Sequence, residues 1–391
     1  MRGLQRLLRD LLFLGLAGVL FWLFLPERFI TNAPFNPAGI NSPDDQLLAD
    51  RIVLPQGFHI NVFAEELPGA RMLEVTDNGD VLVSLPASGR VVLLQRDDAG
   101  DGKSDGQIDL VSDLDRPHGL DIHGGWLFIA EAGALGRIRF DSNKRSTSGE
   151  YEQIVTGLPR GGNHWSRSVR SGPDGLIYVS VGSSCNVCIE NDPRRAAILR
   201  FNPDGSGSEI FATGLRNTVG FDWQPDTGLL YGVDNGRDLL GDDYPPCELN
   251  LIERGGFYGW PYANGDKVPD PDLGENRTAE IRGSIAPVHG FAAHTAPLGM
   301  AFLRNSRLPE NYRQALLVAL HGSWNRSERQ GYEVVSLHFQ EDGRILERKF
   351  ASGFEIDEDV IGRPVDVAEG INGEIYISDD YTGMVYRVVH R

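Results

Sequence analysis

The chain has 391 residues, of which 41% are hydrophobic and 24% are charged, so it is long enough to bury a large core. Its 47 Gly and 22 Pro interrupt almost every stretch that would otherwise form a long helix, and this composition favours an all-β protein. The formal net charge of −18 argues against nucleic acid as a partner, because binding to phosphates needs clustered Lys and Arg.

The N-terminal segment has the composition of a membrane-targeting sequence. An uncharged apolar run, LLFLGLAGVLFWLFL, extends from Leu11 to Leu25, and no small-x-small cleavage site follows it. The basic residues Arg2, Arg6 and Arg9 precede the run and are expected to stay in the cytoplasm. We therefore predict an uncleaved signal-anchor helix, in preference to a signal peptide that is removed.

This interpretation divides the chain into three parts. Residues 1–27 form the membrane anchor, residues 28–50, which are rich in Pro and Asn, form a linker, and residues 51–391 form one exported domain. The protein is then expected to be periplasmic and held on the inner, cytoplasmic membrane by its N-terminus.

A structural unit recurs along the exported part. It consists of a short apolar stretch, a turn with Asp, Asn or Gly, an alternating strand, and a second strand after a Gly-containing turn. One copy alone cannot bury both faces of its sheet, whereas a radial arrangement packs sheet against sheet. We therefore predict an all-β, six-bladed β-propeller, and keep a pair of β-sandwiches as the alternative. The six copies begin at Met72, Pro117, Ser168, Thr218, Leu298 and Pro364.

Three further segments belong to this prediction. The strand GFHINVFAE, which precedes the first copy, is expected to complete the last blade and close the ring. Two insertions, residues 242–282 and residues 323–329, are expected to lie on one rim and to build the site, since loops on a rigid scaffold usually carry function.

The cysteine content argues against a disulfide scaffold, because Cys185, Cys188 and Cys247 are too few for a chain of this length. In an exported protein the pair in SSCNVC can close a small loop, which leaves Cys247 over; free thiols are the alternative. Haem attachment needs a His after the second Cys, where Ile189 stands, and no further zinc ligands lie nearby. We therefore expect a structural role rather than redox or metal chemistry.

Polar residues interrupt the apolar strands near corresponding points of the different copies. The innermost strand of each propeller blade faces the central channel, so such residues can converge although they are far apart in sequence. The candidates are His118, His164, Arg167, Arg216, Asn217, His294, His321, Trp324, Asn325, Arg326 and Arg363.

Five stretches, in this order, carry a resemblance to a known family: NHWSRSVRSGPDGLIYVSVGS, TGLRNTVGFDW, CELNLIERGGFYGWPY, HTAPLGMAF and HGSWNR. From about Leu54 onward the chain resembles the soluble aldose or glucose dehydrogenases that depend on pyrroloquinoline quinone (PQQ). Within that family it is most similar to the sorbosone and pyranose dehydrogenase branch.

The resemblance implies a catalytic pair. Oxidation of a sugar needs a base that removes a hydroxyl proton and an electron acceptor above the sugar. The family's catalytic histidine lies in the segment that contains His164, and Arg216 with Asn217 matches the pair that contacts the quinone oxygens. The alternative for His164 is a partly buried residue, beside Trp165, whose hydrogen bonds go to the backbone.

The resemblance also implies how the three carboxylates of PQQ are bound, since Arg forks suit them. Arg363 in IGRPVDV resembles a family arginine with this task, and Arg326 in HGSWNR shares it. The soluble glucose enzymes have a lysine near the cofactor where this chain has VALHGSWNR, so we expect His321 or Arg326 to replace it.

Calcium is the usual partner of PQQ, and in the family main-chain carbonyls hold it. The corresponding loop here offers Asn235, Gly236 and Arg237. A second oxygen-rich turn, RDDAGDGKSDG, is interpreted as a polar hairpin loop, with a structural calcium loop as the alternative. Its candidate ligands are Asp97, Asp101 and Asp105.

Taken with the resemblance, these residues predict a quinoprotein that oxidises a sugar, hemiacetal or aldehyde, to a lactone or acid. A respiratory quinone or cytochrome is the expected electron acceptor. One alternative is a calcium-dependent, lactonase-like hydrolase, which needs several carboxylate ligands in the channel. Another is a non-catalytic binding propeller at the cell surface, which needs no convergence of His164, Arg216, Asn217 and Arg363.

Overall fold

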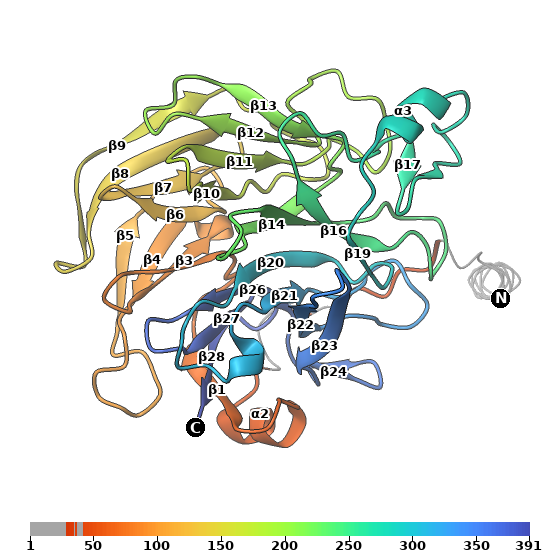
Figure 1. Ribbon diagram of the computed structural model, residues 1–391. Helices are drawn as coiled ribbons and strands as arrows, with labels where there is room; N and C mark the ends of the chain where they lie inside the picture. Colours follow the sequence, from red (N-terminus) through yellow and green to blue (C-terminus); the bar gives the residue numbers. More distant parts are fainter. Residues whose placement is uncertain (1–28, 35, 37–41) are drawn as a thin grey trace, which may run out of the picture.

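Six four-stranded antiparallel sheets surround a central channel in the computed structural model (Figure 1). The structure describes residues 29–34, 36 and 42–391. The predicted six-bladed propeller is confirmed, and the alternative of two sandwiches is wrong. Within the described ranges no helix has the length and apolar character needed to cross a bilayer. The predicted anchor, residues 1–27, lies outside them.

The six blades begin at the six predicted copies, and in each the strands follow one another outward from the channel. Blades 1 to 3 are β2 (Leu73–Val75), β3 (Val81–Leu85), β4 (Arg90–Leu94) and β5 (Gln107–Val111); β6 (Leu120–His123), β7 (Trp126–Ala130), β8 (Ala134–Asp141) and β9 (Ser146–Thr156); and β10 (Val169–Ser171), β11 (Ile177–Val181), β12 (Ala197–Phe201) and β13 (Glu209–Thr213). Blades 4 and 5 are β14 (Thr218–Trp223), β15 (Leu230–Asp234), β16 (Cys247–Ile252) and β19 (His289–Phe291); and β20 (Pro297–Phe302), β21 (Leu316–Leu320), β22 (Glu333–Phe339) and β23 (Ile345–Ala351). Blade 6 is β26 (Pro364–Glu369), β27 (Ile375–Asp379), β28 (Met384–His390) and β1 (Phe58–Ala64).

The N-terminal strand closes the ring, as predicted. Strand β1 pairs with β28 in antiparallel register from Phe58 opposite His390 to Ala64 opposite Val385. The first and last parts of the propeller are thereby joined in one sheet, and the edge of β28 is covered.

The second strand is buried along its whole length in five of the six blades, because both faces of its sheet pack against neighbouring blades; in blade 2, β7 begins with the half-buried Trp126. Strands β3, β11, β15, β21 and β27 have no exposed or half-exposed residue. They are accordingly rich in Val, Ile and Leu. The outer strand β9, by contrast, has no buried residue.

Charged residues fill part of the channel. The guanidinium of Arg170 on β10 donates to Glu74 on β2 at 3.0 Å. Two carboxylates reach into the following blade: Asp222 accepts from the N–H of Phe302 at 2.9 Å, and Asp366 accepts from the N–H of Leu73 at 2.8 Å. Burial raises the pKa of Glu74 to about 8. These contacts bind innermost strands of different blades to one another.

The predicted linker contains a helix. Asp44 caps α2 (Asp45–Arg51) by accepting from the N–H of Leu47 at 2.8 Å. Leu48 is fully buried in the core, and Asp45 accepts from the N–H of Val62 on β1. The helix therefore fastens the chain to the closing strand (Figure 1).

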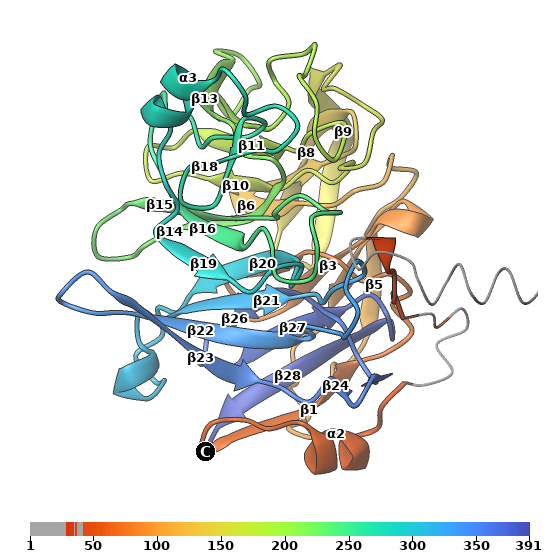
Figure 2. The ribbon, with the colours of Figure 1, turned by 90° about the vertical axis from the view of Figure 1, so that its right-hand side faces the viewer.

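The larger insertion lies between β16 and β19 and starts after Ile252. Its predicted start at Asp242 is wrong, because β16 lies within the predicted range and is a strand of blade 4. It carries β17 (Ala263–Asn264), β18 (Val268–Pro269) and α3 (Thr278–Gly283), and α3 lies beyond β13 of blade 3 (Figure 2). Residues 323–329 connect β21 to β22, as predicted. The remaining elements are η2 (Pro86–Ser88), η3 (Glu310–Tyr312), β24 (Glu355–Ile356) and β25 (Asp359–Val360).

Ring closure predicts a stability effect at Phe58, whose ring packs on Tyr312, Phe350 and His390 at centroid distances of 5.2, 5.2 and 4.9 Å. We expect Phe58→Ala to lower the free energy of unfolding by about 3 to 5 kcal/mol, because a large buried side chain leaves a cavity. Urea unfolding measures it. The control Val53→Ala, at a 67% exposed residue, is expected to change little; a similar loss in both variants would contradict the prediction.

Candidate active site

Polar residues gather at one end of the channel, because every blade presents the start of its innermost strand there. Four of them stand two positions before that strand, and a fifth stands one position before it. They are Arg71, His118, Arg167, Arg216 and Arg363. The convergence predicted for the last four is confirmed, whereas Arg71 was not among the predicted candidates.

His164 is a neutral base with one nitrogen free. Its Nδ1 lies 3.0 Å from the carbonyl oxygen of Ser183 and 2.9 Å from Ser183 Oγ, so this nitrogen carries the proton. Nε2 has no hydrogen-bond partner within the part of the chain that the structure describes. Burial, with the nearby charge of Arg216, lowers the pKa of His164 to about 3. The lone pair of Nε2 is therefore available at neutral pH.

Asn217 lies beside this histidine. A Cβ placed on Gly182 would meet His164 Cβ at 2.6 Å and Asn217 Oδ1 at 2.7 Å, so the two side chains flank the same glycine. Only a residue without a side chain allows that approach. The side-chain amide of Asn217 makes no hydrogen bond to any described residue and can contact a ligand, whereas its backbone N–H donates to Asp234 at 2.5 Å.

Arg216 is saturated by the protein itself. Its Nε donates to the carbonyl of Asn186 at 2.9 Å, and Nη1 donates to the carbonyls of Asn235 at 3.1 Å and Gly236 at 2.9 Å. Its Nη2 donates to Asn186 Oδ1 at 2.8 Å and to Asp238 Oδ2 at 3.1 Å. All five N–H groups are thus committed. In this arrangement Arg216 shapes the wall of the site.

The same contacts bear on the predicted calcium site. The carbonyls of Asn235 and Gly236 face a guanidinium, which is itself a cation, so they do not form an open site as they stand. The side chain of Arg237 turns away and pairs with Asp270 at 2.6 Å and Asp272 at 2.8 Å. Calcium at these three residues stays a prediction.

The second calcium candidate has the contacts of a polar hairpin loop. Asp97 accepts from the N–H groups of Gly100, Asp101 and Gly102 and from the guanidinium of Arg387. Its oxygens are therefore already occupied by donors.

A chain of charged groups crosses the mouth of the channel. Arg71 donates to Asp380 at 2.6 Å, Asp380 lies 2.8 Å from His321 Nε2, and Arg363 donates to the carbonyl of His321 at 3.2 Å. Burial and the charge of Arg363 lower the pKa of His321 to about 4. Of the two residues expected to replace the family's lysine, His321 is thus the one that lies among these charges.

Several polar atoms in and beside this group of charged residues have no hydrogen-bond partner among the described residues. Arg71 Nε–H is a buried donor without a partner among the described residues, and His118 Nε2 is a buried acceptor without one, because Nδ1 of His118 donates to the carbonyl of Arg167 at 3.1 Å. Arg363 uses Nε and Nη2 on backbone carbonyls, and its Nη1 has no partner in the described ranges. Two arginines with donors to spare, beside neutral histidines, fit an anionic molecule with several carboxylates.

Arg326 lies apart from this group. Its Nη1 donates to the carbonyl of Asp242 and its Nη2 to Asp243 at 3.0 Å, so its charge is compensated within the rim loops. Its predicted contact with a cofactor stays a prediction.

Three contributors were missed in the sequence: Arg71, Asn186 and Asp380. Arg71 could have been found, since it stands before the first strand of its copy as Arg216 does. Asn186 and Asp380 lie on loops after second strands, and nothing in their local sequence marks them.

Comparison with known proteins gives a consistent result. A family model described as Glucose / Sorbosone dehydrogenase matches residues 129–387. An uncharacterised protein of Borreliella burgdorferi is 33% identical over 291 residues, which cover 71% of this chain and 76% of that protein.

Two further matches come from one fungal protein. The pyrroloquinoline quinone-dependent pyranose dehydrogenase of Coprinopsis cinerea is 27% identical over 277 residues; the match covers 58% of this chain but only 37% of the fungal protein. The holo structure of its PQQ domain has a TM-score of 0.73 at 22% identity and covers 86% of this chain and 97% of the domain. At that identity the structural match shows a shared fold.

The saturation of Arg216 predicts a structural cost. We expect Arg216→Met to lower the free energy of unfolding by about 3 kcal/mol, because Asp238 and three backbone carbonyls lose their hydrogen bonds to the guanidinium. Urea unfolding measures the loss. Arg344→Met serves as control, since that side chain is 81% exposed. A loss below about 1 kcal/mol would show that water replaces the guanidinium.

Proposed function

The chain belongs to the glucose / sorbosone dehydrogenase family of sugar-oxidising enzymes, and we propose that it oxidises an aldose or a sorbosone-like sugar to a lactone or acid with bound PQQ. One observation carries the proposal: a neutral histidine with a free Nε2, His164, stands at the same channel end as two arginines whose donors are not used up.

His164 acts as the base. Its Nδ1–H is held by Ser183, so Nε2 faces the channel as the acceptor for the proton of the sugar hydroxyl. Burial keeps that nitrogen unprotonated, and Asn217 beside it can donate to a sugar or quinone oxygen. When bound, PQQ supplies the two-electron acceptor for the sugar carbon.

Arg71 and Arg363 bind the carboxylates of the cofactor. Both have free N–H donors, and Asp380 fixes Arg71 from the other side. Because His321 is buried and neutral, Arg71 and Arg363 are the positive charges within this group of residues. An anionic molecule would therefore be drawn to this end of the channel.

The lactonase-like hydrolase is less well supported. Such a site needs several carboxylates around one ion. In the described ranges the only group of three or more candidate ligand side chains is Cys185, Cys188 and Glu190, and its two sulfurs are bonded to each other. A non-catalytic propeller would not explain why Arg71 and Arg363 have N–H donors without a partner among the described residues.

We also propose that the N-terminal anchor holds the propeller at the membrane. The segment that follows the predicted anchor lies on the rim loop: Asn32 N–H donates to the carbonyl of Trp324 at 2.8 Å, and Asn325 donates to the carbonyl of Ile30 at 2.7 Å. Ile30 is five positions after Leu25, a reach of about 18 Å at most. With an anchor in the periplasmic face of the membrane, this rim would stand close to a respiratory quinone or cytochrome.

The first test is a titration of the purified full-length chain with PQQ, with and without calcium, followed by a panel of aldoses while the cofactor absorbance is recorded. We expect binding and sugar-driven reduction. In His164→Gln, kcat should fall about 10²- to 10⁴-fold with little change in the affinity for PQQ, because only proton removal is lost. Since the pKa of His164 is about 3, kcat/KM should not fall through protonation of this base between pH 8 and 5.

The matched control is His59→Gln, at an exposed histidine on β1. Retention of more than a tenth of kcat in His164→Gln would contradict the role of the base. Absence of PQQ binding under all conditions would leave the binding propeller as the better interpretation.

The arginines predict an affinity effect. We expect Arg71→Ala and Arg363→Ala each to weaken PQQ binding about 10- to 100-fold, since a hydrogen bond to a charged group contributes about 1.5 to 3 kcal/mol. Equilibrium titration measures it. Arg326→Ala should change the affinity by only a few fold, because that residue pairs with Asp242 and Asp243. The reverse order of effects would restore Arg326 as the cofactor ligand.

A further inference from the structure

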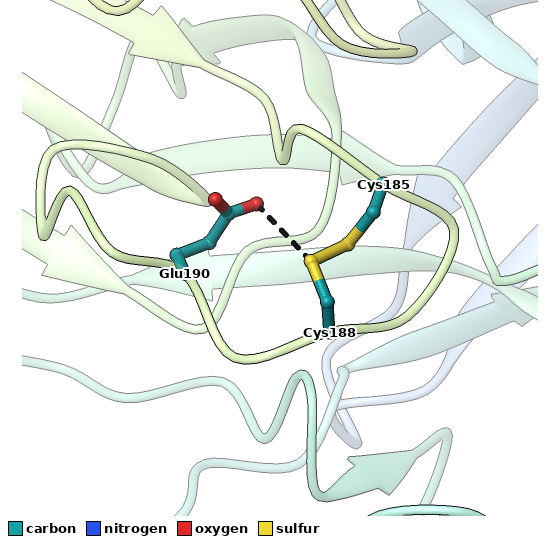
Figure 3. A group of neighbouring side chains, drawn as sticks. All are labelled: Cys185, Cys188 and Glu190. Atoms are coloured by element: carbon teal, nitrogen blue, oxygen red, sulfur yellow. Dashed lines mark hydrogen bonds between the residues drawn. A yellow bond between two sulfur atoms is a disulfide. The ribbon is translucent and has the colours of Figure 1, made fainter.

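The loop between β11 and β12 contains a disulfide beside the site. Cys185 and Cys188 are bonded, with a Cα–Cα distance of 6.2 Å, and Glu190 lies next to the pair (Figure 3). Glu190 accepts from the N–H of Ser184 at 2.5 Å and from its hydroxyl at 2.9 Å. The loop is thus closed twice, once by the disulfide and once by a carboxylate.

Ser183, which precedes the ring, contacts His164. Ser183 Oγ donates its proton to the carbonyl of Cys185 at 2.7 Å, and so it must act as acceptor toward His164 Nδ1 at 2.9 Å. The carbonyl oxygen of Ser183 accepts from the same Nδ1 at 3.0 Å, so the tautomer and the orientation of the His164 ring depend on where the loop places both acceptors of Ser183.

The ring itself contacts Arg216. Asn186, inside the four-residue ring, accepts from Arg216 through both its carbonyl and its side chain. It also donates to the carbonyl of Asp238 at 3.0 Å and accepts from the N–H of Asp238 at 2.8 Å. One residue thus connects the ring to the wall of the site.

We propose that the Cys185–Cys188 disulfide is the positioning element of the active site, which orients His164 through Ser183 and fixes Arg216 through Asn186. This inference rests on the proposed sugar oxidation. Opening the ring loosens the loop that follows Ser183, so the carbonyl and the hydroxyl of Ser183 can both move away from His164 Nδ1. His164 can then adopt the tautomer with the proton on Nε2, which has no lone pair to accept a proton.

We expect dithiols to impair the site, because they can open the ring. A dithiol reduces the bond in two exchange steps: its thiolate attacks one sulfur, a mixed disulfide forms, and its second thiol releases the protein as two thiols while the reagent becomes the disulfide. Both cysteines are partly exposed, and Ile189 beside them is 57% exposed, so the bond is accessible. The ring closes only a short loop, so its effect on global stability is small and its effect is local.

The test follows the imidazole of His164 by ¹⁵N NMR in the full-length chain, before and after dithiothreitol and in the Cys185→Ser/Cys188→Ser variant. In the oxidised chain we expect a single tautomer protonated at Nδ1. Ring opening should mix the tautomers and lower kcat about tenfold or more, with KM and the unfolding midpoint little changed and activity restored on reoxidation. Cys247→Ser is the control, because that thiol is buried and unpaired.

Ser183 provides a second, independent variant. Ser183→Ala removes the hydroxyl but keeps the carbonyl that accepts from Nδ1, so with the disulfide intact the single tautomer should persist, and reduction of this variant should mix the tautomers. Unchanged ¹⁵N shifts and unchanged kcat on reduction would overturn the proposal. If the oxidised chain oxidises no sugar, the proposed function fails, but the NMR result still decides the role of the ring.

Discussion

Closure of the ring by β1 and β28 is the constraint on which the rest of the structure depends. A blade is stable only between two neighbours, so the series of six needs its first strand in its last sheet. Once closed, the ring brings the innermost strands together around one channel, and residues more than two hundred positions apart in sequence, such as Arg71 and Asp380, come into contact. The site is a consequence of closure more than of any local motif.

The charged groups of the site differ in whether the protein itself pairs them. Arg216 and Arg237 are neutralised by carbonyls and carboxylates of the protein, whereas Arg71 and Arg363 keep donors free. Burial removes the charge from the histidines instead, since a buried imidazolium is costly. The result is a neutral imidazole close to arginines that keep N–H donors free.

Much of this could be predicted from the sequence, and the reason is repetition. Six copies of one pattern predict six blades, and the equivalent position before each first strand predicts the convergence of His118, Arg216 and Arg363. Side-chain partners were beyond prediction, because they depend on how the loops fold over the rim. Arg326 and Arg237 have the right residue type and position, but acidic residues of the rim loops and the large insertion take up their charges.

The four-residue ring at Cys185 has a consequence for biosynthesis. A propeller can form in a compartment that keeps thiols reduced, since no other disulfide occurs among the described residues. With the role proposed for the ring, the orientation of His164 would be completed only where an oxidant meets the folded chain. Folding and activation would then be separate events in time, and folded protein would stay inactive until the Cys185–Cys188 bond had formed.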